Sequence, residues 1–144
     1  MLIAAILKHK GTEVVSVAPA DRVVDVVRIL DQRRIGAALV RDAEGRIIGI
    51  ISERDIIRGM AGHGQGTSQL PAEQLMTRDL VTVTPETLVV EALGLMTNHR
   101  VRHLPVLVDG QLAGLVSIGD LVKARIEEAE YETETLKTYV ASAG

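Results

Sequence analysis

The 144-residue chain contains an internal duplication, and this feature limits its possible folds more than any other. Identical residues recur 66 positions apart at Val17/Val83, Pro19/Pro85, Val24/Val90, Arg34/Arg100 and Val40/Val106. The spacing becomes 65 at Gly49/Gly114, Ser52/Ser117 and Asp55/Asp120, because the second predicted hairpin turn is one residue shorter. A register kept over such a length indicates two copies of one structural unit, and neither copy is expected to close a core alone.

Each copy has the hydrophobic pattern of a β-α-β-β-α unit. For the first copy the pattern predicts helices at 3–10, 23–30 and 53–60, and strands at 12–17, 36–40 and 46–51. For the second it predicts helices at 71–76, 88–96 and from 119 onward, and strands at 80–84, 104–108 and 111–117. The predicted domains are a first repeat at 1–60 that includes the N-terminal helix, a Gly-rich linker at 61–70, and a second repeat at 71–144 with an extended C-terminal helix. The expected fold class is α+β (α/β-like), with two tandem repeats packed face to face about a pseudo-two-fold axis.

Composition excludes several classes of function. The net charge of −3 leaves no general basic surface for nucleic acid, and Tyr131 and Tyr139 are the only aromatic residues on which bases could stack. The sequence has no cysteine, so a disulfide framework, a thiolate nucleophile and a cysteine zinc site are all excluded. No apolar run approaches the about 20 residues that span a bilayer. The apolar start at 1–7 lacks a basic leader and a cleavage site, so we expect a cytoplasmic protein.

Both repeats end in the same motif, an apolar strand that runs from glycine into Ser-x-x-Asp and then into a helix. It spans residues 49–55 in the first repeat and 114–120 in the second. Ser-x-x-acid before an apolar run is a helix-capping signal, and for a single copy this structural interpretation is favoured. The same helix start also offers free N–H groups, a hydroxyl and a carboxylate to an anion or a polyol. Because the motif is duplicated in a duplicated setting, we favour a binding site.

Taken together, these motifs resemble those of the paired cystathionine-β-synthase (CBS) domains, or Bateman modules. The other marks are Asn-His-Arg-Val-Arg-His-Leu-Pro-Val-Leu at 98–107 and Glu-Gln-Leu-Met-Thr at 73–77. The resemblance covers essentially the whole chain. It implies an adenosine-type ligand such as AMP, ADP, ATP, NAD or S-adenosylmethionine, held in clefts between the repeats, with the motif aspartate on the ribose hydroxyls.

The resemblance also implies which residues form the two clefts. One would use Ser52, Arg54 and Asp55 with Val101, Arg102 and His103. The other would use Ser117 and Asp120 with Thr12, Ile35, Gly36 and Ala37. The two are expected to differ, because the first gathers three potential cations and the matching positions of the second, Gly36, Ala37 and Gly119, carry none. We therefore expect the Asp55 cleft to prefer phosphate-bearing ligands, more so as the pH falls toward 6 and His103 gains its proton.

Other chemistry finds little support in the sequence. The histidines at 9, 63, 99 and 103 lack metal-site spacing, and the basic run at 8–10 is interpreted as a charge set at a helix C-terminus rather than a phosphate site. No catalytic triad, P-loop or dinucleotide fingerprint is present, so we expect no catalytic residues and no metal.

The favoured function is a regulatory module that signals occupancy to an unknown client. The alternatives are a structural dimerisation adaptor with vestigial clefts and, third, a nucleotide-processing enzyme that would use His103. A homodimer is expected, because the last helix carries exposed apolar residues such as Ile126 and Leu136 that need cover.

Overall fold

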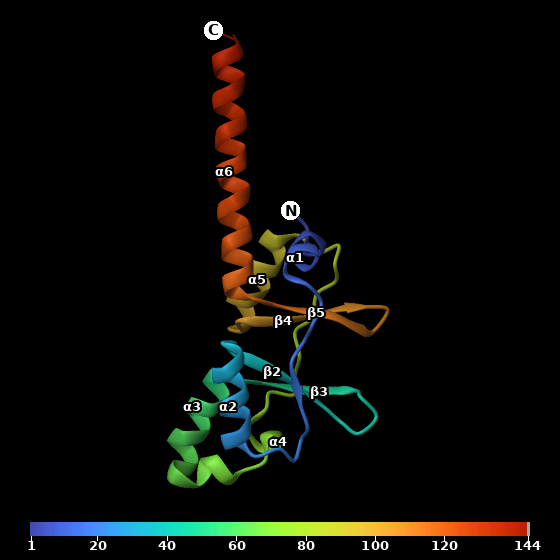
Figure 1. Cartoon of the computed structure of the whole chain (residues 1–144), viewed down its shortest axis with the longest axis vertical. Coiled ribbons are helices and arrows are strands. Elements are labelled where there is room, and N and C mark those ends of the chain that lie inside the picture. The colour runs from blue at the N-terminus through green and yellow to red at the C-terminus, as the bar shows by residue number, and fades with distance from the viewer. Residues whose placement is uncertain (144) are drawn as a thin grey trace. The chain divides into compact units, whose positions relative to one another are not determined.

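The computed structural model describes residues 1–143, which form two compact units (Figure 1). Unit 1 comprises Met1–Glu13 together with the chain from Val81 onward, and unit 2 comprises Val14–Leu80. This division differs from the expected boundaries at 1–60 and 71–144. The N-terminal segment packs with the second repeat, and residues 61–80 pack with the first, so each repeat is completed by the segment that precedes the other repeat in the chain.

Unit 2 is a three-stranded sheet covered by helices. Its elements are β1 (Ser16–Val17), α2 (Val23–Arg33), β2 (Ala37–Arg41), β3 (Ile47–Ser52), α3 (Glu53–His63), a 3-10 helix η1 (Gly64–Gln69) and α4 (Ala72–Leu75). The strand order is β1-β2-β3, with β1 parallel to β2 and β2 antiparallel to β3. The predicted helices and the predicted hairpin are confirmed, and the first strand is shorter than its expected span of 12–17.

The segment at 61–70 is not the linker that its glycines predicted. Helix α3 continues to His63 and passes directly into η1. The side chain of Thr67 is buried, and its hydroxyl donates to the carbonyl oxygens of Gly59 at 3.1 Å and Gly64 at 2.7 Å. These two hydrogen bonds fasten the turn onto the end of α3, so the glycines serve a tight, ordered connection.

Unit 1 is built around a β-hairpin and three helices. Its elements are α1 (Ile3–Lys10), α5 (Val89–His99), β4 (His103–Val108), β5 (Gln111–Ser117) and α6 (Ile118–Ala143). Strands β4 and β5 are antiparallel, and Asp109 and Gly110 turn the hairpin with positive φ angles of 51° and 77°. The predicted strand at 80–84 is wrong, because only an isolated parallel bridge joins Val83 to Val106. The hairpin, α1, α5 and the last helix are confirmed.

Each unit has its own hydrophobic core. In unit 2, one face of α2 (Val23, Val26 and Leu30) packs with Val40 and Ile51 of the sheet. In unit 1, Ile3, Ile6 and Leu7 of α1 pack with buried residues of α5, α6, β4 and β5. Backbone hydrogen bonds fix α1 further, since the N–H of Ile3 donates to the Thr87 carbonyl at 2.9 Å. The N-terminal helix is therefore an integral part of unit 1.

The glycine that opens each motif is required by close packing. A Cβ atom on Gly49 would lie 2.6 Å from Sδ of Met76, and one on Gly114 would lie 2.6 Å from Cδ2 of Leu7. In both units, the segment that precedes the other repeat in the chain thus packs directly on the strand that leads to Ser-x-x-Asp. This packing brings the end of that segment to the helix start where the candidate site lies.

Candidate functional site

Both Ser-x-x-Asp motifs form helix caps. In unit 2, the Asp55 N–H donates to Oγ of Ser52 at 3.3 Å, and the Ser52 N–H donates back to Oδ2 of Asp55 at 2.9 Å. In unit 1, the Asp120 N–H donates to Oγ of Ser117 at 3.2 Å, and the Ser117 N–H donates to Oδ2 of Asp120 at 2.8 Å. The capping interpretation is therefore confirmed in both copies. The caps also hold each carboxylate in one position at a helix N-terminus.

The carboxylate of Asp55 is enclosed by its own unit. Its Oδ2 accepts a second hydrogen bond from the Ser52 hydroxyl at 3.0 Å, and its Oδ1 accepts one from the Thr77 hydroxyl at 3.0 Å. The residue is only 9% exposed. Three hydroxyl and amide donors already bind the two oxygens, and the low exposure leaves a ligand hydroxyl little access to the remaining acceptor site.

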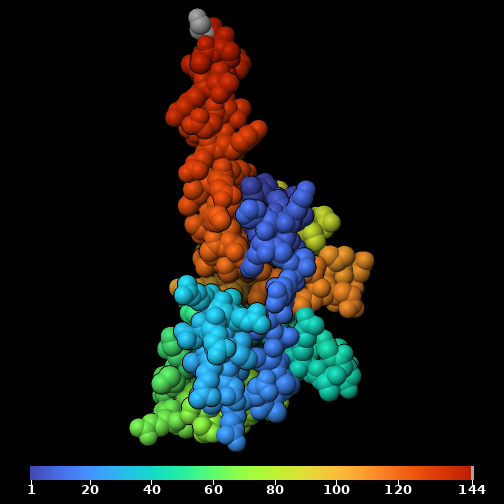
Figure 2. All heavy atoms as spheres, viewed as in Figure 1, coloured from blue at the N-terminus to red at the C-terminus, as the bar shows by residue number. Residues whose placement is uncertain are grey.

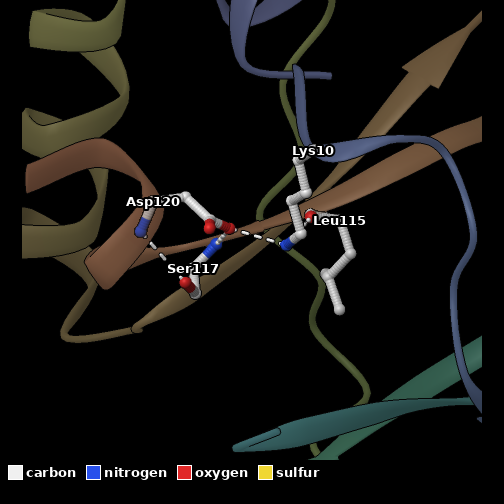
Figure 3. A network of polar contacts seen from close by, with 4 residues as sticks. All are labelled: Lys10, Leu115, Ser117 and Asp120. Atoms are coloured by element: carbon white, nitrogen blue, oxygen red, sulfur yellow. Dashed lines mark hydrogen bonds and ion pairs between the residues drawn. The ribbon is translucent and has the colours of Figure 1, made fainter. Parts of the chain in front are cut away.

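The carboxylate of Asp120 has different surroundings (Figure 3). The ammonium group of Lys10 donates to Oδ2 at 2.6 Å and also to the carbonyl oxygen of Leu115 at 2.8 Å. The Asp120 side chain is 25% exposed, and the hydrogen bonds from the Lys10 ammonium and the Ser117 N–H both go to Oδ2. One carboxylate oxygen is therefore held by protein donors, and the other can accept hydrogen bonds from a ligand.

Lys10 and Thr77 have equivalent roles in the two units. The Thr77 N–H donates to the carbonyl of Ile50 at 2.8 Å, and the Lys10 ammonium donates to the carbonyl of Leu115, the residue that matches Ile50 in the duplication. Each residue ends the segment that precedes the other repeat in the chain, and each donates to the motif aspartate of its own unit. In unit 1 this donor is a cation, and in unit 2 it is a neutral hydroxyl.

The charges in unit 1 shift two pKa values. Burial alone would raise the pKa of Asp120, but the hydrogen bonds from Lys10 and Ser117 and the Lys10 charge hold it below its ordinary value. Burial lowers the pKa of His103, and the charges of Lys10 and Arg102 lower it further against the opposing effect of Asp120. His103 therefore gains its proton at lower pH than the sequence-based expectation assumed.

Within each unit, the predicted residues group by strand pairing. In unit 1, His103 pairs with Ser117, and the carbonyl of Arg102 accepts the Ile118 N–H at 2.8 Å. Val101 is half-buried against the unit 1 core, and Thr12 is exposed two residues beyond Lys10. Arg102 and His103 thus lie at the start of α6, beside Asp120.

The matching arrangement in unit 2 contains no cation at those two positions. Ala37 pairs with Ser52, and the carbonyl of Gly36 accepts the Glu53 N–H at 3.0 Å. Ile35 packs against the unit 2 core, and Arg54 is half-buried in the first turn of α3. The grouping of residues from both repeats around one ligand stays a prediction.

Sequence reasoning missed Lys10 and Thr77. The comparison of the two clefts counted cations only at matching positions and did not include Lys10, which contacts Asp120 but was interpreted as part of the charge set at a helix C-terminus. Thr77 lies in a motif that the sequence did single out, but no local pattern indicates that its hydroxyl reaches Asp55. Among residues 1–143, no group of three or more histidine, aspartate or glutamate side chains could hold a metal ion.

Comparison with known proteins identifies the family of the two repeats. The CBS domain model matches residues 9–62 and again residues 72–127, which together make up most of the chain. The chain belongs to the CBS-domain family. Each CBS match contains one Ser-x-x-Asp motif with its helix cap.

Three relatives illustrate the likeness of this CBS pair to known proteins. A mitochondrial CBS domain-containing protein of Arabidopsis thaliana, CBSX3, is 40% identical over 83% of this chain, and the match covers only 60% of that protein. A CBS-domain containing protein of Agrobacterium tumefaciens is 37% identical with a TM-score of 0.85, and the match covers 86% of this chain and 92% of the other. The CBS domain pair of protein MJ0100, solved with 5′-methylthioadenosine and S-adenosyl-L-methionine, has a TM-score of 0.77 at 22% identity, covering 89% of this chain and 98% of that one.

Across residues 1–143, no helix combines the length and the apolar character that crossing a membrane needs.

Proposed function

We propose that this CBS pair is a regulatory module that binds an adenosyl ligand of the AMP, ADP, ATP or NAD type and signals its occupancy to a partner protein. The observation that carries the proposal is the arrangement at Asp120. A partly exposed carboxylate is held rigidly at a helix start, with one oxygen open and a lysine ammonium 2.6 Å from the other. The open oxygen suits a ribose hydroxyl, and the ammonium and the helix N-terminus suit a phosphate.

The two motif carboxylates are not equivalent in this proposal. Asp55 is nearly buried and already accepts hydrogen bonds from Ser52 and Thr77. A ligand hydroxyl would have to reach a nearly buried oxygen that the Thr77 hydroxyl already binds, whereas Asp120 is more exposed and can accept a ligand hydroxyl without losing a bond. We therefore propose that the Asp120 site fills first, which reverses the order expected from counting the cations in the sequence.

Relatives with the same fold support the class of ligand. The MJ0100 pair was crystallised with two adenosyl compounds, so this fold is able to hold an adenosine group. In the present chain, an adenine ring would contact aliphatic rather than aromatic side chains, since the only aromatic residues are Tyr131 and Tyr139 in the last helix. The ribose and phosphate groups are consequently expected to supply most of the specificity.

Calorimetry on the wild-type chain and three variants tests the proposal. AMP, ATP, NAD and S-adenosylmethionine are titrated at neutral pH, and Asp120→Asn should weaken binding about tenfold or more, because a hydrogen bond to a charged group contributes roughly 1.5–3 kcal/mol. Asp55→Asn is the matched control in the other repeat and should weaken the first binding event less. Lys10→Met should reduce the affinity for AMP more than that for adenosine, because only AMP carries a phosphate.

Three outcomes would contradict the proposal in different ways. Equal losses from the two Asn variants would refute the order of filling, and equal effects of Lys10→Met on AMP and adenosine would refute the phosphate contact. No heat with any of the four compounds would favour the structural adaptor, the alternative that the internal hydrogen bonds of both carboxylates support. Release of a chemically altered nucleotide would favour an enzyme. The cytoplasmic location, the homodimer and the client protein stay predictions.

A further inference from the structure

Helix α6 carries a second apolar face that the core of unit 1 does not use. The residues of α6 that face the core are Leu121 and Ala124, near the start of the helix. Beyond Glu128 every described residue of the helix is exposed. Figure 1 shows this part of α6 continuing well past the other elements of unit 1, and the space-filling view in Figure 2 shows none of them covering it on the viewed face.

The exposed part of α6 has a heptad repeat. Side chains spaced alternately three and four residues apart fall on one stripe of a helix, which is the pattern of a coiled-coil seam. With the first position of the heptad called a and the fourth called d, the a positions are Ile126, Thr133 and Val140, and the d positions are Ala129, Leu136 and Ala143. Ile126 is 54% exposed and Leu136 is 63% exposed, so the stripe has no partner within unit 1.

We propose that this stripe pairs with the same stripe of a second copy of the chain, as a parallel two-stranded coiled coil. All three a positions are β-branched and one d position is leucine, a combination that in parallel coiled coils favours two strands. Thr133 is polar, but its hydroxyl donates to the carbonyl of Ala129 at 3.0 Å within its own helix. The hydroxyl therefore needs no partner across the seam, although the small side chain and the alanines make the pairing weak.

The charges beside the seam favour the parallel orientation, which makes more contacts between opposite charges. In a parallel pair, each residue before an a position (g) faces the residue after the next d position (e) of the partner. Arg125 then faces Glu130, and Glu132 faces Lys137, so both contacts join opposite charges. An antiparallel pair that overlaps all six seam positions would keep only the contacts between Glu130 and Lys137, and it would place Glu132 against Tyr139.

The ion pairs present within the helix do not oppose this arrangement. Arg125 lies 3.8 Å from Glu128, and Lys137 lies 3.7 Å from Glu134, each one turn away on the same helix. Exposed pairs of this kind contribute little, so both cations can turn toward a partner helix at small cost.

Disulfide cross-linking tests the orientation, because the chain has no cysteine of its own. The variant Ala143→Cys places a thiol at the last d position, where a parallel pair brings the two copies together. The variant Ala141→Cys is the matched control, with its thiol on the outer side of the same turn. Under mild oxidation we expect rapid dimeric cross-linking of the first variant and many-fold slower cross-linking of the second. Equal rates, or no cross-linking of Ala143→Cys, would overturn the proposal.

Four further variants test the seam and its charges in the Ala143→Cys background. Leu136→Glu should abolish the rapid cross-linking, and Tyr131→Glu, on the opposite side of the helix, should leave it unchanged. Glu132→Lys should slow it several-fold, and adding Lys137→Glu should restore it by reversing the pair. Light scattering should show concentration-dependent dimers of the wild-type chain. A strict monomer, or a charge reversal without rescue, would show that another occupant covers this face.

Discussion

Substitution of Gly49 by alanine should destabilise unit 2 more than the matching substitution of Gly114 destabilises unit 1. A Cβ atom at Gly49 would lie 2.6 Å from Sδ of Met76 and 2.9 Å from the carbonyl oxygen of Thr77. That carbonyl is fixed, because it accepts the Ile50 N–H at 3.0 Å. The new methyl group therefore forces the backbone at Thr77 to shift or strains the strand.

The corresponding methyl group at Gly114 meets a more adaptable neighbour. Its short contact, 2.6 Å, is with Cδ2 at the end of the Leu7 side chain, and the other Leu7 atoms lie at 3.4 Å or more. A leucine side chain can rotate away, whereas a hydrogen-bonded carbonyl cannot. Overpacking a core costs about 1–3 kcal/mol, and replacing glycine in a strand recovers roughly 0.5–1 kcal/mol of conformational entropy. We expect a loss of about 2 kcal/mol for Gly49→Ala and less than about 1 kcal/mol for Gly114→Ala.

Urea unfolding followed by circular dichroism measures this difference. With a denaturant slope of about 2 kcal/mol/M, Gly49→Ala should lower the unfolding midpoint by about 1 M, and Gly114→Ala should lower it by less than about half of that. Thr77 also donates to Asp55, so Gly49→Ala should loosen that hydrogen bond as well. A larger loss for Gly114→Ala than for Gly49→Ala would refute the argument that the fixed carbonyl decides the cost.

Two further predictions concern single hydrogen-bonding side chains. Lys10→Met should cost roughly 0.2–1 kcal/mol at pH 7, because the ion pair with Asp120 is partly exposed. The pKa of Asp120 is lowered in the folded chain, so this contribution to stability is present above the ordinary carboxyl pKa and is lost as the pH falls through the folded pKa. The urea midpoints of the wild-type chain and Lys10→Met should therefore converge at low pH. A constant difference between the two midpoints at all pH values would exclude an ionic origin. Thr67→Val should cost about 1–2 kcal/mol by removing the hydroxyl that binds the carbonyls of Gly59 and Gly64, while Thr67→Ser should retain most of that stability in the same assay.

The sequence by itself determined the features that depend on neighbouring residues. The duplication, the helices with a clear 3.6-residue pattern, the two hairpins and both Ser-x-x-Asp caps were all predicted. Hydrogen bonds within a cap join residues only three positions apart, as between Ser52 and Asp55, so the local sequence is enough to indicate them. The extended last helix and its exposed apolar residues were also predicted, because the helical pattern is likewise a property of neighbouring residues.

Only the tertiary structure decided which residues complete each site. Lys10 and Asp120 are 110 positions apart, and Thr77 and Asp55 are 22 apart, so their contacts depend on how the segment before one repeat packs against the other repeat. The same packing placed α1 in unit 1 and ordered the glycine-rich turn around Thr67, both against expectation. Side-chain type and periodicity describe what each segment buries, but they do not state which of two similar repeats it is buried against.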